Sequence, residues 1–157
     1  MFRKYAAVIG PDMNEAGHVS VGGYLTIFDR ATDCLREHVG LGRTYAIETN
    51  HGMYVAEAHI AYERELRAGD AISVGSLVVD VGANKLHLHD RMRHEPAGTT
   101  AAEVELIVLH VDRKTGRTAL FPEPILARLR ALAARHAELS KPPLVGRPLS
   151  LRRLRKD

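Results

Sequence analysis

The stretch that decides the fold is YLTIFDRATDCLREHV, residues 24–39. Apolar side chains recur along it at spacings of three and four residues, and Gly40 and Gly42 end the run. This periodicity predicts an amphipathic helix, and Gly is a common helix terminator. Such a helix needs a large apolar surface against which its buried face can pack.

The segments around this helix predict strands separated by turn residues. Strands are expected over residues 2–9, 44–49, 53–66, 71–82, 85–94 and 99–112, and a second helix over residues 123–139. The strands are expected to form one mostly antiparallel sheet, and the long helix is the largest element available to cover its apolar face. The sequence therefore predicts an α+β fold in which a curved sheet wraps around a long central helix, with an added C-terminal helix.

Composition predicts one globular domain over residues 1–140 and a basic, Pro-containing tail over residues 141–157, in a chain of 157 residues. The tail holds six basic residues against one acidic residue, so the rest of the chain is mildly acidic and a nucleic-acid partner is not expected. Neither a membrane span nor a secretory signal is recognised, and the only cysteine, Cys34, allows no internal disulfide. A cytoplasmic protein without a membrane partner is expected.

Chemistry-bearing side chains gather in DMNEAGHV, residues 12–19, ahead of the long helix. The free N–H groups and the positive dipole end of a helix start can polarise a carbonyl oxygen. Thioester hydrolysis needs this help because it develops an oxyanion, and a nearby carboxylate can attack the carbonyl or activate water. Helix capping and turn formation are the structural alternative for the same residues.

The run from Asp12 to Phe28 resembles the signature of the 4-hydroxybenzoyl-CoA thioesterase group of hotdog proteins. YVAEAHI (54–60), ELRAGD (65–70), KLHL (85–88) and LHVD (109–112) further resemble the betainyl-CoA thioesterases of carnitine degradation, which occur alone or fused to L-carnitine dehydrogenase. The resemblance implies a hotdog fold and hydrolysis of a small acyl-CoA thioester, with coenzyme A as part of the substrate and no separate cofactor. It also implies a homodimer, or a homotetramer built as a dimer of dimers, with active sites between subunits.

The loop departs from the family pattern at one position. Asn14 stands where the family usually places its catalytic Asp, and an amide can be neither nucleophile nor general base. If residues 15–16 are an insertion, the carboxylate role falls to Asp12, and Glu15 is a third candidate. Gly17 and His18 complete the expected catalytic loop, with His18 either donating toward the carbonyl or stabilising the turn.

A second candidate carboxylate lies on the strand expected over residues 53–66. Strand alternation places Glu57 and His59 on one face and Tyr54 on the other. The hotdog resemblance places this strand beside the partner's helix start, which makes Glu57 a candidate general base or water-orienting group. Aromatic faces would suit a quaternary ammonium acyl group. The expected substrate-binding residues are Val19, Tyr24, Tyr54 and His59.

The remaining sequence patterns bear on a metal site, on the phosphates of coenzyme A and on alternative functions. His87 and His89 share a strand face, but no third ligand has a motif spacing, so no metal is expected. Lys85, Arg91, Arg93 and the tail arginines are candidates to meet the phosphates of coenzyme A, since phosphate-binding motifs rich in glycine are missing. The alternative functions are a hotdog hydratase or dehydratase on acyl thioesters and a non-catalytic acyl-CoA-binding module.

Overall fold

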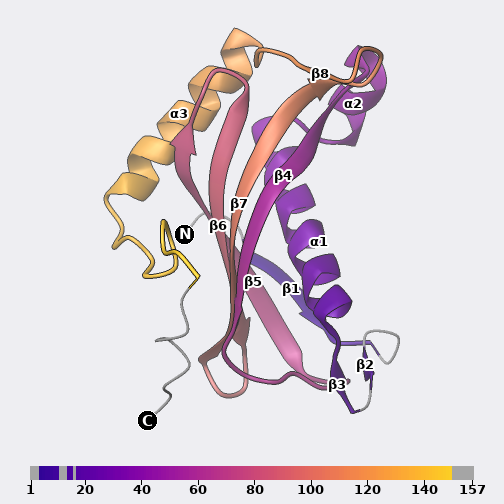
Figure 1. The fold of residues 1–157 in the computed structure, drawn as a ribbon, viewed down its shortest axis with the longest axis vertical. Coiled ribbons are helices and arrows are strands. Elements are labelled where there is room, and N and C mark those ends of the chain that lie inside the picture. The colour runs from indigo at the N-terminus through magenta and orange to yellow at the C-terminus, as the bar shows by residue number, and fades with distance from the viewer. Residues whose placement is uncertain (1–3, 11–13, 16, 150–157) are drawn as a thin grey trace.

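A computed structural model describes residues 4–10, 14–15 and 17–149 of the chain (Figure 1). The elements, in chain order, are β1 (Lys4–Val8), β2 (Asn14–Glu15), β3 (His18–Val19), α1 (Val21–Val39), α2 (Arg43–Thr49), β4 (His51–Tyr62), β5 (Ala71–Val81), β6 (Lys85–His94), β7 (Thr99–Asp112), β8 (Arg117–Thr118) and α3 (Glu123–Ala137). None of the helices in the described ranges is long and apolar enough to span a membrane.

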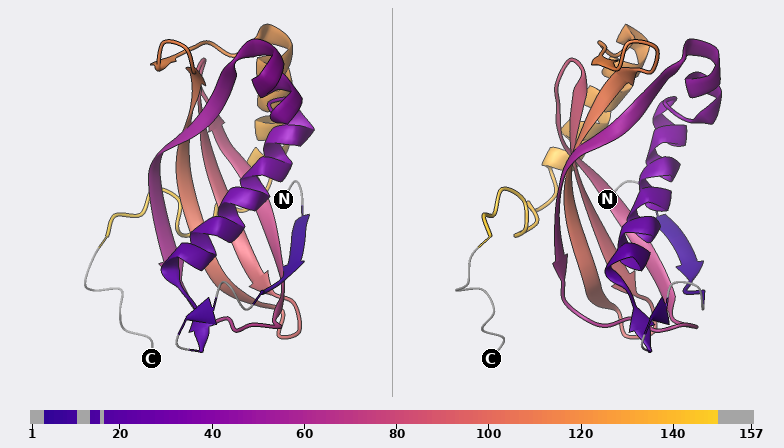
Figure 2. Two further views of the ribbon diagram at one scale, coloured as in Figure 1. Left: turned by 90° about the vertical axis from the view of Figure 1, so that its right-hand side faces the viewer. Right: turned by 45° about the vertical axis from the view of Figure 1, so that its right-hand side comes forward.

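The main sheet is antiparallel and has the strand order β1-β5-β6-β7-β4, with β8 paired to β7. Its strands curve, and α1 lies across the concave face, as the two views in Figure 2 show. β2 and β3 form a separate two-stranded ribbon just before α1. This arrangement confirms the predicted fold of a curled sheet wrapped around a long helix.

Helix α1 is held by its caps and by its buried face. The Ser20 hydroxyl accepts a hydrogen bond from Gly23 N at the first turn, and Gly40 ends the helix in the left-handed conformation, with φ of 87°. Ile27, Phe28 and Leu35 are almost fully buried against the sheet. Burial of each such side chain contributes about 1.5–3 kcal/mol, so packing, more than helix propensity, fixes α1 on the sheet.

Helix α3 packs against β5, which the described residues of β1 pair with along residues 71–75. Farther along β5, Val78 N donates a hydrogen bond to His136 Nδ1 of α3 at 2.9 Å. Leu129 of α3 is fully buried in the core. The helix therefore satisfies part of a strand edge that would otherwise be open.

The described part of the C-terminal tail packs against the chain. Leu144 and Val145 are buried, and Gly146 N donates to the Glu105 carboxylate on β7 at 2.9 Å. Figure 1 shows this segment descending from α3 on the side of the sheet away from α1.

Two expectations about local structure were wrong. Residues 44–49 were expected to be a strand, yet they lie in helix α2, where Glu37 Oε1 accepts from Arg43 N at 2.8 Å and Asn50 ends the helix in the left-handed conformation. Tyr54 was expected on the face opposite Glu57 and His59. A β-bulge between Val55 and Glu57 reverses the alternation, so Tyr54 shares their face.

Candidate active site

The first turn of α1 presents backbone N–H groups that its own caps leave free. Ser20 satisfies Gly23 N through its hydroxyl and Tyr24 N through its carbonyl, at 3.1 Å each. Within the described part of the chain, no residue accepts from the N–H of Val21 or Gly22. No acidic residue occupies this turn, so the positive end of the helix dipole is available to a bound oxygen atom.

A cavity of about 350 Å³ opens at this helix start. We call it the helix-start cleft, and it lies between the first turn of α1 and the chain that follows β4. Val19 N donates to Leu66 O at 2.8 Å, which ties the two segments together. The residues that line the helix-start cleft are His18, Val19, Ser20, Val21, Tyr24, Tyr62, Glu63, Arg64 and Glu65.

Two tyrosine rings form an aromatic wall in the helix-start cleft. Tyr24 and Tyr62 pack edge to face, with ring centroids 5.2 Å apart. Burial raises the pKa of Tyr24, so its hydroxyl stays protonated and donates to Arg64 O at 3.0 Å. Tyr62 remains 42% exposed and can offer ring surface to a ligand.

Two carboxylates, on Glu63 and Glu65, also line the helix-start cleft. Glu65 meets Arg67 at 3.9 Å in an exposed ion pair, which is a weak constraint on either side chain. Neither glutamate was predicted as a site residue, and both fall within the strand that was expected over residues 53–66. No local sequence pattern marks them, because the end of β4 at Tyr62 is set by pairing with β7.

The structure brings together three of the residues predicted for the site. His18, Val19 and Tyr24 all line the helix-start cleft. Gly17 is exposed in the turn between β2 and β3 with φ of 89°, a conformation that favours glycine. In the paired backbone of that ribbon, Asn14 lies opposite Val19 and Glu15 opposite His18. Asp12 lies outside the described residues, as do the side chains of Asn14 and Glu15.

The three predicted residues on β4 lie apart from the cleft of their own chain. Glu57 pairs with Ile107 and His59 with Glu105, on the sheet face away from α1, and Tyr54 joins them there. Met53 and Ile60, on the other face, pack in the core instead. Any role of Glu57 in catalysis would therefore involve a surface on the outer face of the sheet.

That outer face carries a network of charged pairs between β6 and β7. His87 Nε2 lies 2.6 Å from Glu105 Oε1, and Arg91 Nε donates to Glu103 Oε1 at 2.5 Å. Burial disfavours the charged form of Glu103, but the neighbouring His89 and Arg91 outweigh this effect and hold the pKa of Glu103 below its usual value. Arg93 donates to Gly98 O at 2.6 Å. Arg91 and Arg93 are thus engaged within the fold.

No three potential metal ligands come together among the residues that the structure describes. His89 is buried, and its Nε2 lies 3.5 Å from Glu103 Oε2. His87 and His89 are therefore arranged as partners of carboxylates.

Similar proteins with known names are thioesterases. The Thioesterase-like superfamily model matches residues 11–129. A betainyl-CoA thioesterase of Pseudomonas aeruginosa is 32% identical over 135 residues, which are 86% of this chain and 85% of that protein. An L-carnitine dehydrogenase/betainyl-CoA thioesterase of Rhizobium meliloti is 29% identical over 87% of this chain. The matched part is only 27% of the length of the Rhizobium meliloti protein.

Solved structures show the same fold. A putative thioesterase from Pseudomonas putida superposes with a TM-score of 0.80 at 26% identity, and a Staphylococcus aureus protein solved in complex with CoA does so with a TM-score of 0.86 at 20% identity. Each comparison covers 94% of both chains.

A curled antiparallel sheet wrapped around a long helix is the hotdog fold, which this chain shares with solved thioesterases. The chain belongs to the thioesterase-like superfamily, and its relatives identify it as an acyl-CoA thioesterase.

Proposed function

We propose that this protein hydrolyses the CoA thioester of a small acyl group, with betainyl-CoA as the leading substrate. The observation that carries the proposal is the start of α1, where two N–H groups unclaimed by described residues lie beside a cleft that holds carboxylates. The similarity to the betainyl-CoA thioesterase of Pseudomonas aeruginosa supports the choice of acyl group.

In this proposal the thioester carbonyl oxygen accepts hydrogen bonds from the N–H groups of Val21 and Gly22. Among the described residues, a Cβ at Gly22 would meet only Ser20 Oγ, at 3.9 Å, so this turn has open space beside its backbone. Fixed donors of this kind stabilise the oxyanion that forms when water attacks, and each contributes about 10²–10³ in rate. Coenzyme A then leaves as its thiolate and is protonated by solvent.

The carboxylate that removes a proton from the attacking water is proposed to come from Asp12, Glu63 or Glu65. Glu63 and Glu65 line the helix-start cleft, and Asp12 precedes α1 in the sequence. His18 and Asn14 would orient the water or the carbonyl group. Glu57, reached from a partner subunit, and Glu15 remain the other carboxylates to test.

A cationic acyl group suits the wall of the helix-start cleft. Betainyl-CoA places a quaternary ammonium one carbon from the thioester carbonyl, so the cation must lie close to the helix start. Tyr62 offers a half-exposed ring there, and two glutamates add negative charge. Cations bind over aromatic faces, and the attraction grows when the site is shielded from water.

A homodimer is proposed to form through β4, alone or as half of a dimer of dimers. β4 is a strand of 12 residues at the edge of the sheet, and Tyr54 and Val55 on it are exposed. Long exposed edges tend to pair with another chain, and two-fold pairing of identical strands is antiparallel. Pairing would place the end of one β4, beside the helix-start cleft, next to the start of the partner's β4.

A cytoplasmic location is also proposed, because a CoA substrate fits a cytoplasmic protein.

The test is thiol release, followed with a thiol-reactive dye, over betainyl, short acyl and aromatic acyl thioesters of CoA. Thiol release with the highest kcat/KM for betainyl-CoA is expected. Asp12→Ala, Glu15→Gln, Glu57→Ala, Glu63→Gln and Glu65→Gln identify the carboxylate, because loss of a general base lowers kcat about 10²–10⁴-fold. Glu138→Gln, on the exposed end of α3, is the matched control and should keep full activity.

Two results would contradict the proposal. One is the absence of thiol release with every CoA thioester. The other is growth of enoyl-thioester absorbance without a free thiol, which would indicate a hydratase or dehydratase.

A further inference from the structure

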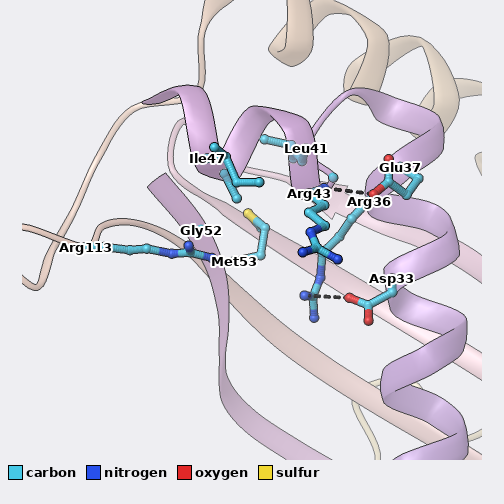
Figure 3. Close-up of a pocket in the computed structure, with 11 residues that line it drawn as sticks. Asp33, Arg36, Glu37, Leu41, Arg43, Ile47, Gly52, Met53 and Arg113 are labelled. Atoms are coloured by element: carbon cyan, nitrogen blue, oxygen red, sulfur yellow. Dashed lines mark hydrogen bonds and ion pairs between the residues drawn. The ribbon is translucent and has the colours of Figure 1, made fainter. Parts of the chain in front are cut away.

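A second cavity, of about 520 Å³, lies at the opposite end of α1 (Figure 3). It is lined by the last turns of α1, by α2, by the start of β4 and by the chain just after β7. We call it the arginine pocket, because Arg36, Arg43 and Arg113 reach it from three separate segments. Leu41, Ile47 and Met53 supply its apolar part.

The charges in the arginine pocket are unevenly compensated. Arg36 is paired with Asp33 at 2.8 Å and with Asp29 at 3.4 Å. The Glu37 carboxylate accepts from Arg43 N, as the dashed line in Figure 3 shows. Among the described residues, the guanidinium groups of Arg43 and Arg113 have neither an ion-pair nor a hydrogen-bond partner. Two positive charges are therefore available to a ligand.

Two glycines make room for this arrangement. A Cβ at Gly42 would collide with the Glu37 carboxylate, which lies there to cap α2. A Cβ at Gly52 would lie 2.8 Å from Arg113 Nε, so a side chain at this position would displace the guanidinium. The absence of side chains at these two positions allows Glu37 and Arg113 to lie where they do.

The wall formed by α2 is fixed to the sheet. Tyr45 of α2 lies 2.9 Å, through its hydroxyl, from Nε2 of His110 on β7, and His110 Nδ1 lies 2.8 Å from Ala119 O. His110 is buried and stacks on Phe121. Because α2 is anchored by this contact, Arg43 projects from an element that is fixed to the sheet.

We propose that the arginine pocket binds phosphate groups, with the nucleotide end of coenzyme A as the expected source. Guanidinium groups match phosphate oxygens in pairs, and they bind phosphate more specifically than a single ammonium does. The choice of coenzyme A as the source of the phosphates rests on the proposed function. In the proposed dimer two β4 strands pair, and the start of β4 borders the arginine pocket. This pairing would bring the arginine pocket of one subunit beside the helix-start cleft of the other. A thioester held at one chain's α1 would then extend its phosphates toward the partner's arginines.

The experiment compares the full-length wild-type protein with the double variant Arg43→Ala/Arg113→Ala. Arg130→Ala, on the exposed face of α3, is the matched control. Calorimetry measures binding of adenosine 3′,5′-bisphosphate and of inorganic phosphate, and steady-state kinetics compare a CoA thioester with the same acyl group on pantetheine. The double variant is expected to bind the bisphosphate at least 10-fold more weakly and to raise KM for the CoA thioester about 10-fold. It should keep kcat, and its kinetics on the pantetheine thioester should not change.

Each outcome bears on the proposal. Bisphosphate binding that is absent from the wild type, or equal in the double variant and the Arg130→Ala control, overturns it. Weakened binding of phosphate and bisphosphate with an unchanged KM for the CoA thioester supports a phosphate site that serves a free phosphate ligand. If the wild type hydrolyses neither thioester but binds the bisphosphate through these arginines, the proposed function fails while the pocket stands.

Discussion

Asp90 on β6 is a fully buried carboxyl group beneath α1, and its ionisation should oppose folding at neutral pH. Thr32 Oγ1 donates to Asp90 Oδ2 at 3.3 Å, whereas Oδ1 has no partner among the described residues. Burial raises the pKa of Asp90 from 3.8 to about 6, although hydrogen bonds from Ser76 and Thr32 and the nearby His89 act in the other direction.

A raised pKa means that the native state holds this proton more tightly than the unfolded state does. The native state is therefore penalised wherever the unfolded carboxyl is ionised: the penalty is absent below pH 3.8, grows as pH rises and is complete above about pH 6. A rise of this size corresponds to about 3 kcal/mol. The substitution Asp90→Asn removes the titration and keeps an acceptor for Thr32.

Chemical unfolding of wild type and Asp90→Asn between pH 4 and pH 7.5 measures this penalty. The free energy of unfolding of the variant, relative to wild type, should rise by roughly 2–3 kcal/mol across this range. Any constant cost of the amide cancels in this comparison. The exposed Asp80→Asn is the control for the removal of a carboxylate elsewhere on the chain. A flat difference for Asp90→Asn as well would refute the reasoning, because Asp90 would then titrate alike in both states.

Three further predictions concern stability. Leu129→Ala empties a fully buried site between α3 and the core and should cost about 2–5 kcal/mol in chemical unfolding, whereas a cost below about 1 kcal/mol would mean that α3 is loosely packed. Ser20→Ala removes the cap of α1 and should cost about 1 kcal/mol, with Ser20→Thr restoring most of it; equal stability of the two variants would show that the cap is unimportant. Burial lowers the pKa of His136, whose Nδ1 accepts a hydrogen bond from Val78 N, so the folded state favours the neutral imidazole. The stability that this histidine contributes should therefore be lost as pH falls below 6.5, the ordinary pKa of histidine. His136→Gln should remove this loss from the pH profile of the unfolding free energy, and an unchanged profile would contradict the assignment.

The sequence was sufficient for the central helix and for the strands beneath it, because burial sets their periodicity. Ile27, Phe28 and Leu35 recur at helical spacing since all three face the sheet. Helix α2 could not be predicted in this way because none of its residues is buried, so it leaves no apolar pattern. The bulge between Val55 and Glu57 is equally invisible, since Ala56 fits either face and the register is set by pairing with β7.

The same distinction applies to the sites. His18, Val19 and Tyr24 could be predicted because the loop and the helix start are continuous in sequence. Glu63 and Glu65 reach the helix-start cleft only because β4 ends at Tyr62, which depends on strand pairing. The arginine pocket joins segments far apart in the chain, and no local pattern links them.

The N–H group of Val21 gives the most direct test of the central claim, that the start of α1 receives the thioester oxygen. Val21 is the first residue of α1, and Ser20 before it has an extended backbone, so proline fits there without breaking the helix. Val21→Pro removes the backbone N–H group, whereas Val21→Ala shortens the side chain and keeps the backbone N–H group. In thiol-release kinetics with the best CoA thioester, Val21→Pro should lower kcat about 10²–10³-fold at unchanged Tm, and Val21→Ala should stay near wild type. Hydrolysis by Val21→Pro at the wild-type rate would contradict the account.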